Sequence, residues 1–197
     1  PPALPLKSAG HIGIVLHYFD VGRVHHQKEH ENGKYVHQRH QIQTTGLVSA
    51  ETKVAREEVT LRAQFEFGAQ TRLTGNSRIT ERFFLGSSKL RGFDGAGVGP
   101  RDLASANNDA LGGNYYAVAR LEADFPLGLP EEYGIRGGVF FDVGSLWGLD
   151  DTNNGTGTGT PVDDSFKLRS VVGVSVLWDT QLGPLRFNFS KALVKED

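Results

Sequence analysis

The chain has 197 residues, a formal net charge of −2 and a pI near 6.4. This near-neutral balance gives no support for a nucleic-acid-binding surface, so no nucleic acid is expected among its partners. The chain contains no cysteine, which excludes a disulfide framework, a Cys-ligated zinc site and a thiol enzyme.

The hydropathy of the chain excludes a transmembrane helix but leaves a transmembrane barrel open. Mean hydropathy is −0.33, and no apolar run reaches the length of about 18 residues that a spanning helix needs. Barrel strands alternate apolar and polar residues, so they average to a similar value. The chain opens PPALPLK, without an initiator methionine, a signal peptide or a lipidation motif. We therefore expect a processed chain or a piece of a longer one.

The first part of the chain predicts one strand followed by a polar segment. Residues 11–24, HIGIVLHYFDVGRV, are rich in β-branched and aromatic residues and predict a strand. Residues 25–46 are nearly free of large apolar side chains and predict a solvated loop or a pair of poorly buried strands. All seven histidines fall within residues 11–40. Histidine pairs at short spacing make a zinc or nickel site conceivable, but no known carboxylate–His motif accompanies them, so an exposed loop is favoured and no metal is assigned.

Strict alternation of apolar and polar residues begins at Val59. In residues 59–67 the odd positions are apolar, and the even positions Thr60, Arg62, Gln64 and Glu66 are polar. The same period of two returns in four later segments, residues 115–125, 135–143, 169–179 and 185–190. A period of two is typical of strands with one apolar face. The sequence therefore predicts an all-β, antiparallel fold.

Two architectures can use such strands. In a soluble β-sandwich the apolar faces make a dry core, whereas in a transmembrane β-barrel they meet lipid and the charged faces line the lumen. The connections alternate between short turns at residues 128–132 and 180–184 and long polar loops at residues 75–113 and 148–166. Short turns at one end and long loops at the other are typical of a barrel, so we predict part of an antiparallel transmembrane β-barrel.

The long loop at residues 78–114 has apolar anchors that argue against plain disorder. At its centre lie Leu90, Arg91, Gly92 and Phe93, one cation between hydrophobic residues. If this loop folds back into a polar cavity, Arg91 needs a carboxylate or several carbonyl partners, because a buried unpaired guanidinium is costly.

A set of motifs, in order along the chain, resembles the C-terminal barrel of the BamA family, the outer-membrane assembly proteins of Gram-negative bacteria. The motifs are GSSKLRGF at 86–93, Gly99-Pro100, LGGN at 111–114, FPL at 125–127, VFFDVG at 139–144 and LGPLR at 182–186. The resemblance runs from about residue 58 to 194. Residues 1–57 match less well and are interpreted as earlier barrel strands and a polar external loop.

The resemblance implies that the Arg-Gly-Phe loop tucks into the barrel lumen and that Arg91 packs against Asp142. Alternation independently places Asp142 on the polar face of its strand. Glu122 and Asp124, on the strand after the loop, are further inward carboxylates that could pin it. The family also has soluble N-terminal repeats and a final closing strand, and we expect both to be absent from residues 1–197, with residues 58–197 forming the C-terminal barrel strands.

The function that the resemblance implies is not enzymatic: an assembly factor that folds and inserts client β-barrel proteins into the outer membrane. Its expected partners are client outer-membrane proteins, outer-membrane lipid and the lipoproteins of an assembly complex. The alternatives are a related barrel for protein export, by two-partner secretion or autotransporter assembly, and a soluble β-sandwich binding module. An outer-membrane enzyme is disfavoured because the chain has no Gly-x-Ser-x-Gly elbow and no phosphate-binding motif, so neither catalytic residues nor a cofactor are expected.

Overall fold

The computed structural model describes residues 13–17, 25–31, 34–54, 58–72, 76–150 and 162–195. Eight strands form one sheet whose neighbours pair antiparallel, and two further short strands form a separate ladder. The described helices are two 3-10 turns, η1 (Ile79–Glu81) and η2 (Glu131–Tyr133). Among the described residues, no helix is long and apolar enough to cross a bilayer.

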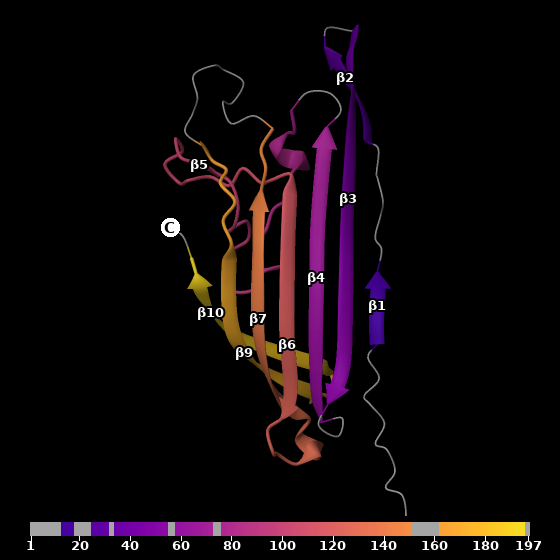
Figure 1. The fold of residues 1–197 in the computed structure, drawn as a ribbon, viewed down its shortest axis with the longest axis vertical. Coiled ribbons are helices and arrows are strands. Elements are labelled where there is room, and N and C mark those ends of the chain that lie inside the picture. The colour runs from indigo at the N-terminus through magenta and orange to yellow at the C-terminus, as the bar shows by residue number, and fades with distance from the viewer. Residues whose placement is uncertain are drawn as a thin grey trace, which may run out of the picture.

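The large sheet has the strand order β1-β3-β4-β6-β7-β9-β10, with β2 also paired to β3 (Figure 1). Its strands are β1 (Gly13–His17), β2 (His25–Glu31), β3 (Lys34–Val54), β4 (Val59–Arg72), β6 (Tyr115–Pro126), β7 (Ile135–Trp147), β9 (Arg169–Thr180) and β10 (Gly183–Val194). The small ladder pairs β5 (Arg101–Asp102) with β8 (Val162–Asp163).

The N-terminal part adds strands to the β4 side of the sheet. β1 covers part of the strand predicted at residues 11–24, and β2 and β3 form a hairpin across residues 25–46, where the sequence left open a loop or two strands. β1 pairs with the second half of β3 and β2 with its first half. The side chains of residues 25–42, which include five of the histidines, lie outside the described part of the structure, and so does any metal site there.

From β4 onward the chain runs up and down with connections of two kinds. Those after β3, β6 and β9 are short, and the one between β6 and β7 lies at the lower end in Figure 1. Those after β4 and β7 are long, and their described residues are 76–114, 148–150 and 162–168. β5 belongs to the first long loop and β8 to the second, so their pairing joins the two loops.

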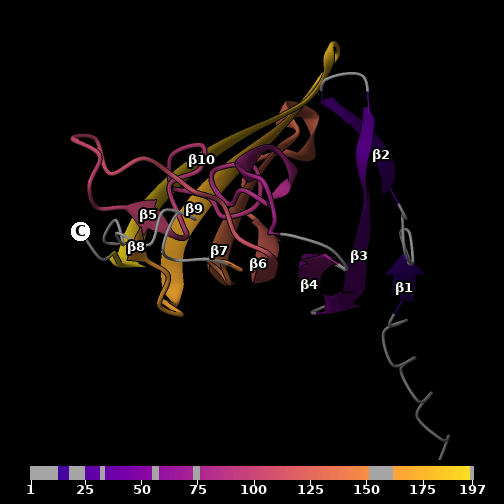
Figure 2. The ribbon, with the colours of Figure 1, turned by 90° about the horizontal axis from the view of Figure 1, so that it is seen from above.

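The two faces of the sheet differ as the alternation predicts. Apolar side chains on one face are exposed, among them Phe65 at 47%, Leu121 at 54% and Phe189 at 64%. Charged side chains of the other face are buried, with Asp124 at 2% and Asp142 at 0%. A sandwich would bury the apolar face, so the sandwich alternative is wrong. The sheet curves into an open arc with residues 76–114 on its concave side (Figure 2), which makes it part of a β-barrel.

Candidate functional site

The loop between β4 and β6 packs onto the inner face of the sheet through apolar side chains. Leu85 and Leu90 are fully buried and form one cluster with Val98 of the same loop. The strands contribute three more buried residues to this cluster, Tyr116, Val118 and Leu146. Backbone contacts shape the loop tip, since the carbonyl of Gly86 accepts hydrogen bonds from the amides of Lys89 and Leu90 at 2.9 and 2.8 Å. This turn presents the next residue, Arg91, to the strands.

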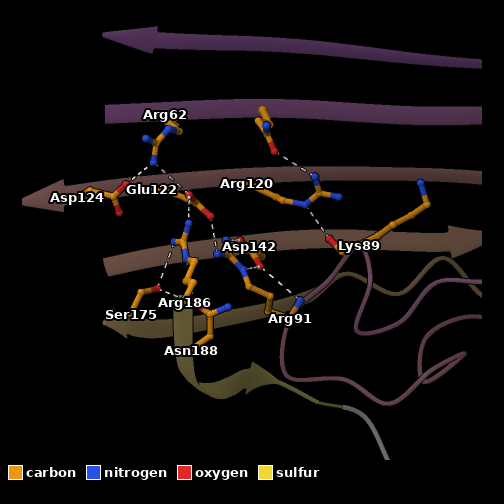
Figure 3. Close-up of polar contacts among 11 residues, drawn as sticks. Arg62, Lys89, Arg91, Arg120, Glu122, Asp124, Asp142, Ser175, Arg186 and Asn188 are labelled. Carbon is orange, nitrogen blue, oxygen red and sulfur yellow. Dashed lines mark hydrogen bonds and ion pairs between the residues drawn. The ribbon is translucent and has the colours of Figure 1, made fainter. Parts of the chain in front are cut away.

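Arg91 meets two carboxylates from neighbouring strands (Figure 3). Its Nε donates to Oδ2 of Asp142 at 2.7 Å and its Nη2 donates to Oδ1 at 2.5 Å, so the contact with β7 is bidentate. Its Nη1 donates to Oε1 of Glu122 on β6 at 2.5 Å. Because Asp142 is fully buried and Arg91 is 17% exposed, these are charge-assisted bonds in a partly dehydrated site, where they are strongest.

Two further residues fit the loop tip to the wall. The Phe140 ring lies under the guanidinium of Arg91, 3.8 Å from Cζ to the ring centroid, a favourable cation–π arrangement. Gly92 has a φ of +80°, and a Cβ at this position would lie 2.8 Å from Oγ of Ser190 and 3.1 Å from Cγ2 of Val171. Both the backbone conformation and the close approach to β9 and β10 therefore require glycine.

The Arg91 contacts belong to a polar network along the inner face, which consists of one group of contacts around Arg91 and another around Lys89 (Figure 3). Glu122 also accepts a hydrogen bond from Arg186 of β10 at 3.1 Å. Toward the loop end, Lys89 pairs with Glu66 of β4, and Arg120 of β6 donates to Oε2 of Glu66 at 3.0 Å and to the Lys89 carbonyl at 2.8 Å. Four strands and the loop are therefore linked by charged contacts.

Charges balance within this network. The loop adds two cations, Lys89 and Arg91, to the charged groups of the strands. Those are five carboxylates, Glu51, Glu66, Glu122, Asp124 and Asp142, and three guanidinium groups, Arg62, Arg120 and Arg186. Burial by itself would lower the pKa of the Arg91 guanidinium, but the hydrogen bonds and charge of Asp142 and the charge of Glu122 outweigh it and raise that pKa above its ordinary value. The loop cation stays charged, and it neutralises an excess of acid on the wall.

Asp124 differs from its expected role as a partner of the loop. It is buried on the inner face of β6, as predicted, but its carboxylate pairs with Arg62 of β4. Asp124 is the next inward-facing residue of β6 after Glu122 and lies farther from the loop. Arg62 lies opposite Glu122 in the β4–β6 register, and it reaches Asp124 in place of the loop cation. Leu90, Arg91, Asp142 and Glu122 are thus brought together, and Asp124 is joined to them only through Arg62, whose Nη1 also lies 4.0 Å from Oε2 of Glu122.

Sequence reasoning missed six charged residues of the network as functional candidates: Glu51, Arg62, Glu66, Lys89, Arg120 and Arg186. Alternation had already placed Glu66, Arg120 and Arg186 on the polar faces of their strands. The pairing register of β4 and β6 brings Glu66 close to Arg120, because the two residues lie within two positions of each other across the strands. Lys89 carried no such signal, since it belongs to the loop.

A second set of contacts fixes the start and the end of the loop, next to the ends of β4, β6 and β7. Oδ2 of Asp150 accepts a hydrogen bond from the Ser77 amide at 2.6 Å, and Oδ1 accepts one from Nδ2 of Asn114 at 2.8 Å. Asn114 in turn accepts a hydrogen bond from Nε2 of Gln70 at 2.7 Å. Arg82 donates to the Ser77 and Leu111 carbonyls at 2.7 and 3.1 Å. The start and end of the loop are therefore tied to each other and to the β7–β9 loop.

The family of this chain is identified by its similarity to known proteins. A profile of the Omp85 superfamily domain matches residues 21–197. The chain belongs to the Omp85 superfamily. One relative, the outer membrane protein assembly factor BamA of Neorickettsia risticii (strain Illinois), is 40% identical over 117 residues, which cover 59% of this chain and 14% of the relative. The protein of the same name from Neisseria meningitidis serogroup B (strain ATCC BAA-335 / MC58) is 28% identical over 133 residues, covering 59% of this chain and 17% of the relative.

The fold of this Omp85 chain also has a solved counterpart. A crystal structure of BamA from Haemophilus ducreyi lacking POTRA domains 1–3 superposes with a TM-score of 0.67 at 20% identity, over 79% of this chain and 32% of that one. The resemblance to the C-terminal barrel of the BamA family is confirmed, and with it an outer-membrane location. The chain spans less than a fifth of the length of the two BamA relatives that it matches in sequence.

Proposed function

We propose that this chain is the C-terminal barrel portion of an assembly factor that folds client β-barrel proteins and inserts them into the outer membrane. The similarity to two relatives named as outer membrane protein assembly factors supports this function. The geometry that carries the proposal is the loop bound to the inner wall through Arg91, Asp142 and Glu122. The proposal assigns no catalytic residue and no cofactor.

The loop acts as an internal brace. Client insertion by a barrel requires part of the wall to open and expose backbone donors and acceptors, which pair readily with an incoming strand. An opening wall needs other strands that keep their register. Here the loop contacts β4, β6 and β7 with charged groups, and Gly92 approaches β9 and β10. Those strands are therefore held at one spacing while the rest of the barrel moves.

The proposed partners follow from the same division of surfaces. The exposed apolar face contacts outer-membrane lipid, the strand edges contact client strands, and the lipoproteins of an assembly complex contact the remaining surface. The proposal also divides the chain into two parts. Residues 1–57 are earlier barrel strands with an external loop, and residues 58–197 are the C-terminal strands that carry the lumenal loop.

A depletion experiment tests the function. The complete gene containing this segment is expressed in its host while the native copy is repressed, and the folded fraction of a client barrel is measured by its heat-modifiable migration on gels. The wild-type gene should restore client insertion. A gene with Asp142→Asn should restore it only partly, because the bidentate contact with Arg91 is lost. Normal client levels without any copy of the gene would overturn the assignment, and a specific loss of one exported protein would indicate export instead.

A further inference from the structure

A groove of about 530 Å³ lies on the outward face of the sheet, on the opposite side from the polar network. It crosses β3, β4, β6, β7 and β9, whose order can be followed in Figure 1. Three short side chains in its lining, those of Ala50, Ala63 and Ala123, leave space beside the larger side chain of Leu121. Apart from Thr52, the outward-facing side chains of the lining are apolar.

The pairing register places the groove along one row of residues that crosses the sheet. Ala50, Ala63, Leu121, Phe141 and Val172 are successive cross-strand partners, one on each strand. The partner of Val172 on the next strand, β10, is Lys191. Residues directly opposite each other in a sheet lie on the same face with their side chains in contact range. Lys191 therefore faces outward, next to the end of the groove.

Lys191 is the exception on an otherwise uncharged face. Among the described residues of β4, β6, β7, β9 and β10, no other outward-facing position carries a charged side chain. Lys191 is exposed, and so are its outward neighbours Phe189 and Val172. No carboxylate pairs with its ammonium group in the part of the chain that the structure describes. A charge that faces lipid is costly without a partner, so we expect Lys191 to bind an anion.

The depth of Lys191 in the membrane indicates which anion it meets. The short connections of these antiparallel strands share one end of the sheet, which is the periplasmic end in an outer-membrane barrel. Lys191 is the eighth residue after Gly183, where β10 begins. At about 3.4 Å per residue and a tilt of about 40°, it lies about 20 Å from that end along the membrane normal. The apolar band of such barrels is about 25 Å tall, so Lys191 lies near its far boundary, at the level of lipid phosphates.

The groove approaches the same boundary as it runs toward Lys191. Ala63 is the fourth residue after the start of β4, and Phe141 is the sixth after the start of β7. Both strands start at the end with the short connections, so the row moves away from the periplasmic end as it crosses the sheet. Five strand spacings separate β3 from β10, about 24 Å in all, which is comparable with an extended fatty acyl chain. An acyl chain in the groove would thus end in a headgroup beside Lys191.

We propose that the groove and Lys191 together bind one anionic phospholipid, with an acyl chain in the groove and the phosphate on Nζ of Lys191. The apolar lining favours a hydrocarbon chain, and the ammonium group supplies the charge that a phosphate requires. The whole apolar face contacts lipid, but this site holds one lipid at a fixed place. The inference rests on the outer-membrane location of the strands and not on client insertion, so it can fail while the proposed function stands.

Native mass spectrometry of the complete detergent-solubilised protein tests the site. The probe is phosphatidylglycerol, and the reference is diacylglycerol with the same acyl chains, which lacks the phosphate. The protein should retain one phosphatidylglycerol saturably and should bind diacylglycerol about fivefold more weakly, the effect of one lysine at an anionic lipid surface. Equal retention of the two lipids would overturn the proposal. A protein partner retained on the groove in place of lipid would overturn it too.

Two substitutions locate the lipid, and each has a matched control. Lys191→Gln should weaken retention of phosphatidylglycerol about fivefold and remove the preference over diacylglycerol. Lys195→Gln removes the same charge beyond the end of β10 and should change neither. Ala63→Phe fills the groove and should weaken retention of both lipids, whereas Ala117→Phe adds the same side chain to the outward face outside the groove and should not. Heat-modifiable migration confirms that each variant is folded, and equal losses in a variant and its control would contradict the site.

Discussion

Arg91 is the residue on which the loop's position depends most, because one guanidinium serves two buried or nearly buried carboxylates. Removing one partner of such a contact leaves the others desolvated and uncompensated. Arg91→Ala should therefore destabilise the folded barrel by about 3–5 kcal/mol. Urea unfolding of the protein in vesicles, followed by tryptophan fluorescence, measures this difference.

The loop itself gives a second measure of the same substitution. In Arg91→Ala the neighbouring Leu90 and Phe93 should become accessible to chymotrypsin, a better probe than trypsin because the substitution removes a trypsin site. Arg91→Lys keeps the charge but cannot form the bidentate contact with Asp142, so it should fall between wild type and Arg91→Ala. Wild-type stability and protection in both variants would refute the pinned loop.

Gly92 offers a test of fit rather than of charge. Gly92→Ala places a Cβ against Ser190 and Val171 at a residue with left-handed φ, and should cost about 1–3 kcal/mol. Gly95→Ala is the matched control on the same loop, because a Cβ there meets nothing within 4 Å and the backbone has no positive φ. Equal unfolding midpoints for the two variants in urea would show that Gly92 is not constrained.

At the residue scale the sequence predicted the face on which a side chain lies better than the side chain that it contacts. Alternation alone placed Asp142, Glu122 and Asp124 on the inner face, and all three lie there. It could not tell which cation each would meet, because that depends on the stagger between strands. Asp124 was expected to contact the loop, and the register gives it Arg62. The pairing of Lys89 with Glu66 was unpredictable, since no periodicity governs a loop.

At the scale of elements, the two long loops behave as one unit because Asp150 of the second holds the start and end of the first. Burial by itself would raise the pKa of Asp150, but hydrogen bonds from Ser77 and Asn114 outweigh it and lower that pKa below its ordinary value. A lowered folded-state pKa gives stabilisation that is fully present above the unfolded value of about 3.9. That stabilisation is lost as pH falls through the folded pKa.

Asp150→Asn should therefore show a stability deficit at neutral pH that closes in acid. Above pH of about 5 the variant should lose the charge-assisted bonds and open the junction of the loops to protease more readily than wild type. Once the pH falls below the lowered folded-state pKa, the wild-type carboxyl is protonated too, and the difference should vanish. Hydrogen exchange of the Ser77 amide across this range measures the effect, and a pH-independent gap would rule out the carboxylate as its cause.

Strand positions were predictable where apolar residues alternate, and their ends were not. The strand expected at residues 59–67 continues through Arg72 in the structure, and the residues added, 68–72, are mostly small or polar. β3 extends over 21 residues, Lys34–Val54. The sequence patterns described residues 25–46 as a polar segment, either a loop or a pair of poorly buried strands, and gave no strand end at residue 54. Backbone pairing with β1, β2 and β4 holds these residues extended, and pairing of this kind leaves no mark in composition.

At the scale of the whole molecule, the orientation of the faces decides every other conclusion. Because the exposed apolar residues of β4, β6, β7, β9 and β10 lie on one face and the charged network on the other, only lipid outside and water inside satisfy both. The sequence predicted this from alternation together with the pattern of short turns and long loops. Curvature, and the packing of a loop against the concave side, follow from three-dimensional contacts that alternation does not encode.

A pair of identical substitutions tests this orientation. Leu121 lies on the apolar face in the middle of β6 and is 54% exposed, and Leu121→Arg should destabilise the protein in a bilayer by about 2–4 kcal/mol, the cost of arginine near the midplane. Leu182 lies in the β9–β10 turn and is fully exposed, so Leu182→Arg should cost about 0–1 kcal/mol, the value near the interface. Folding titrations in vesicles compare the two free energies of unfolding. Equal costs would mean that the face carrying Leu121 does not meet lipid, and the outer-membrane assignment of these strands would fail.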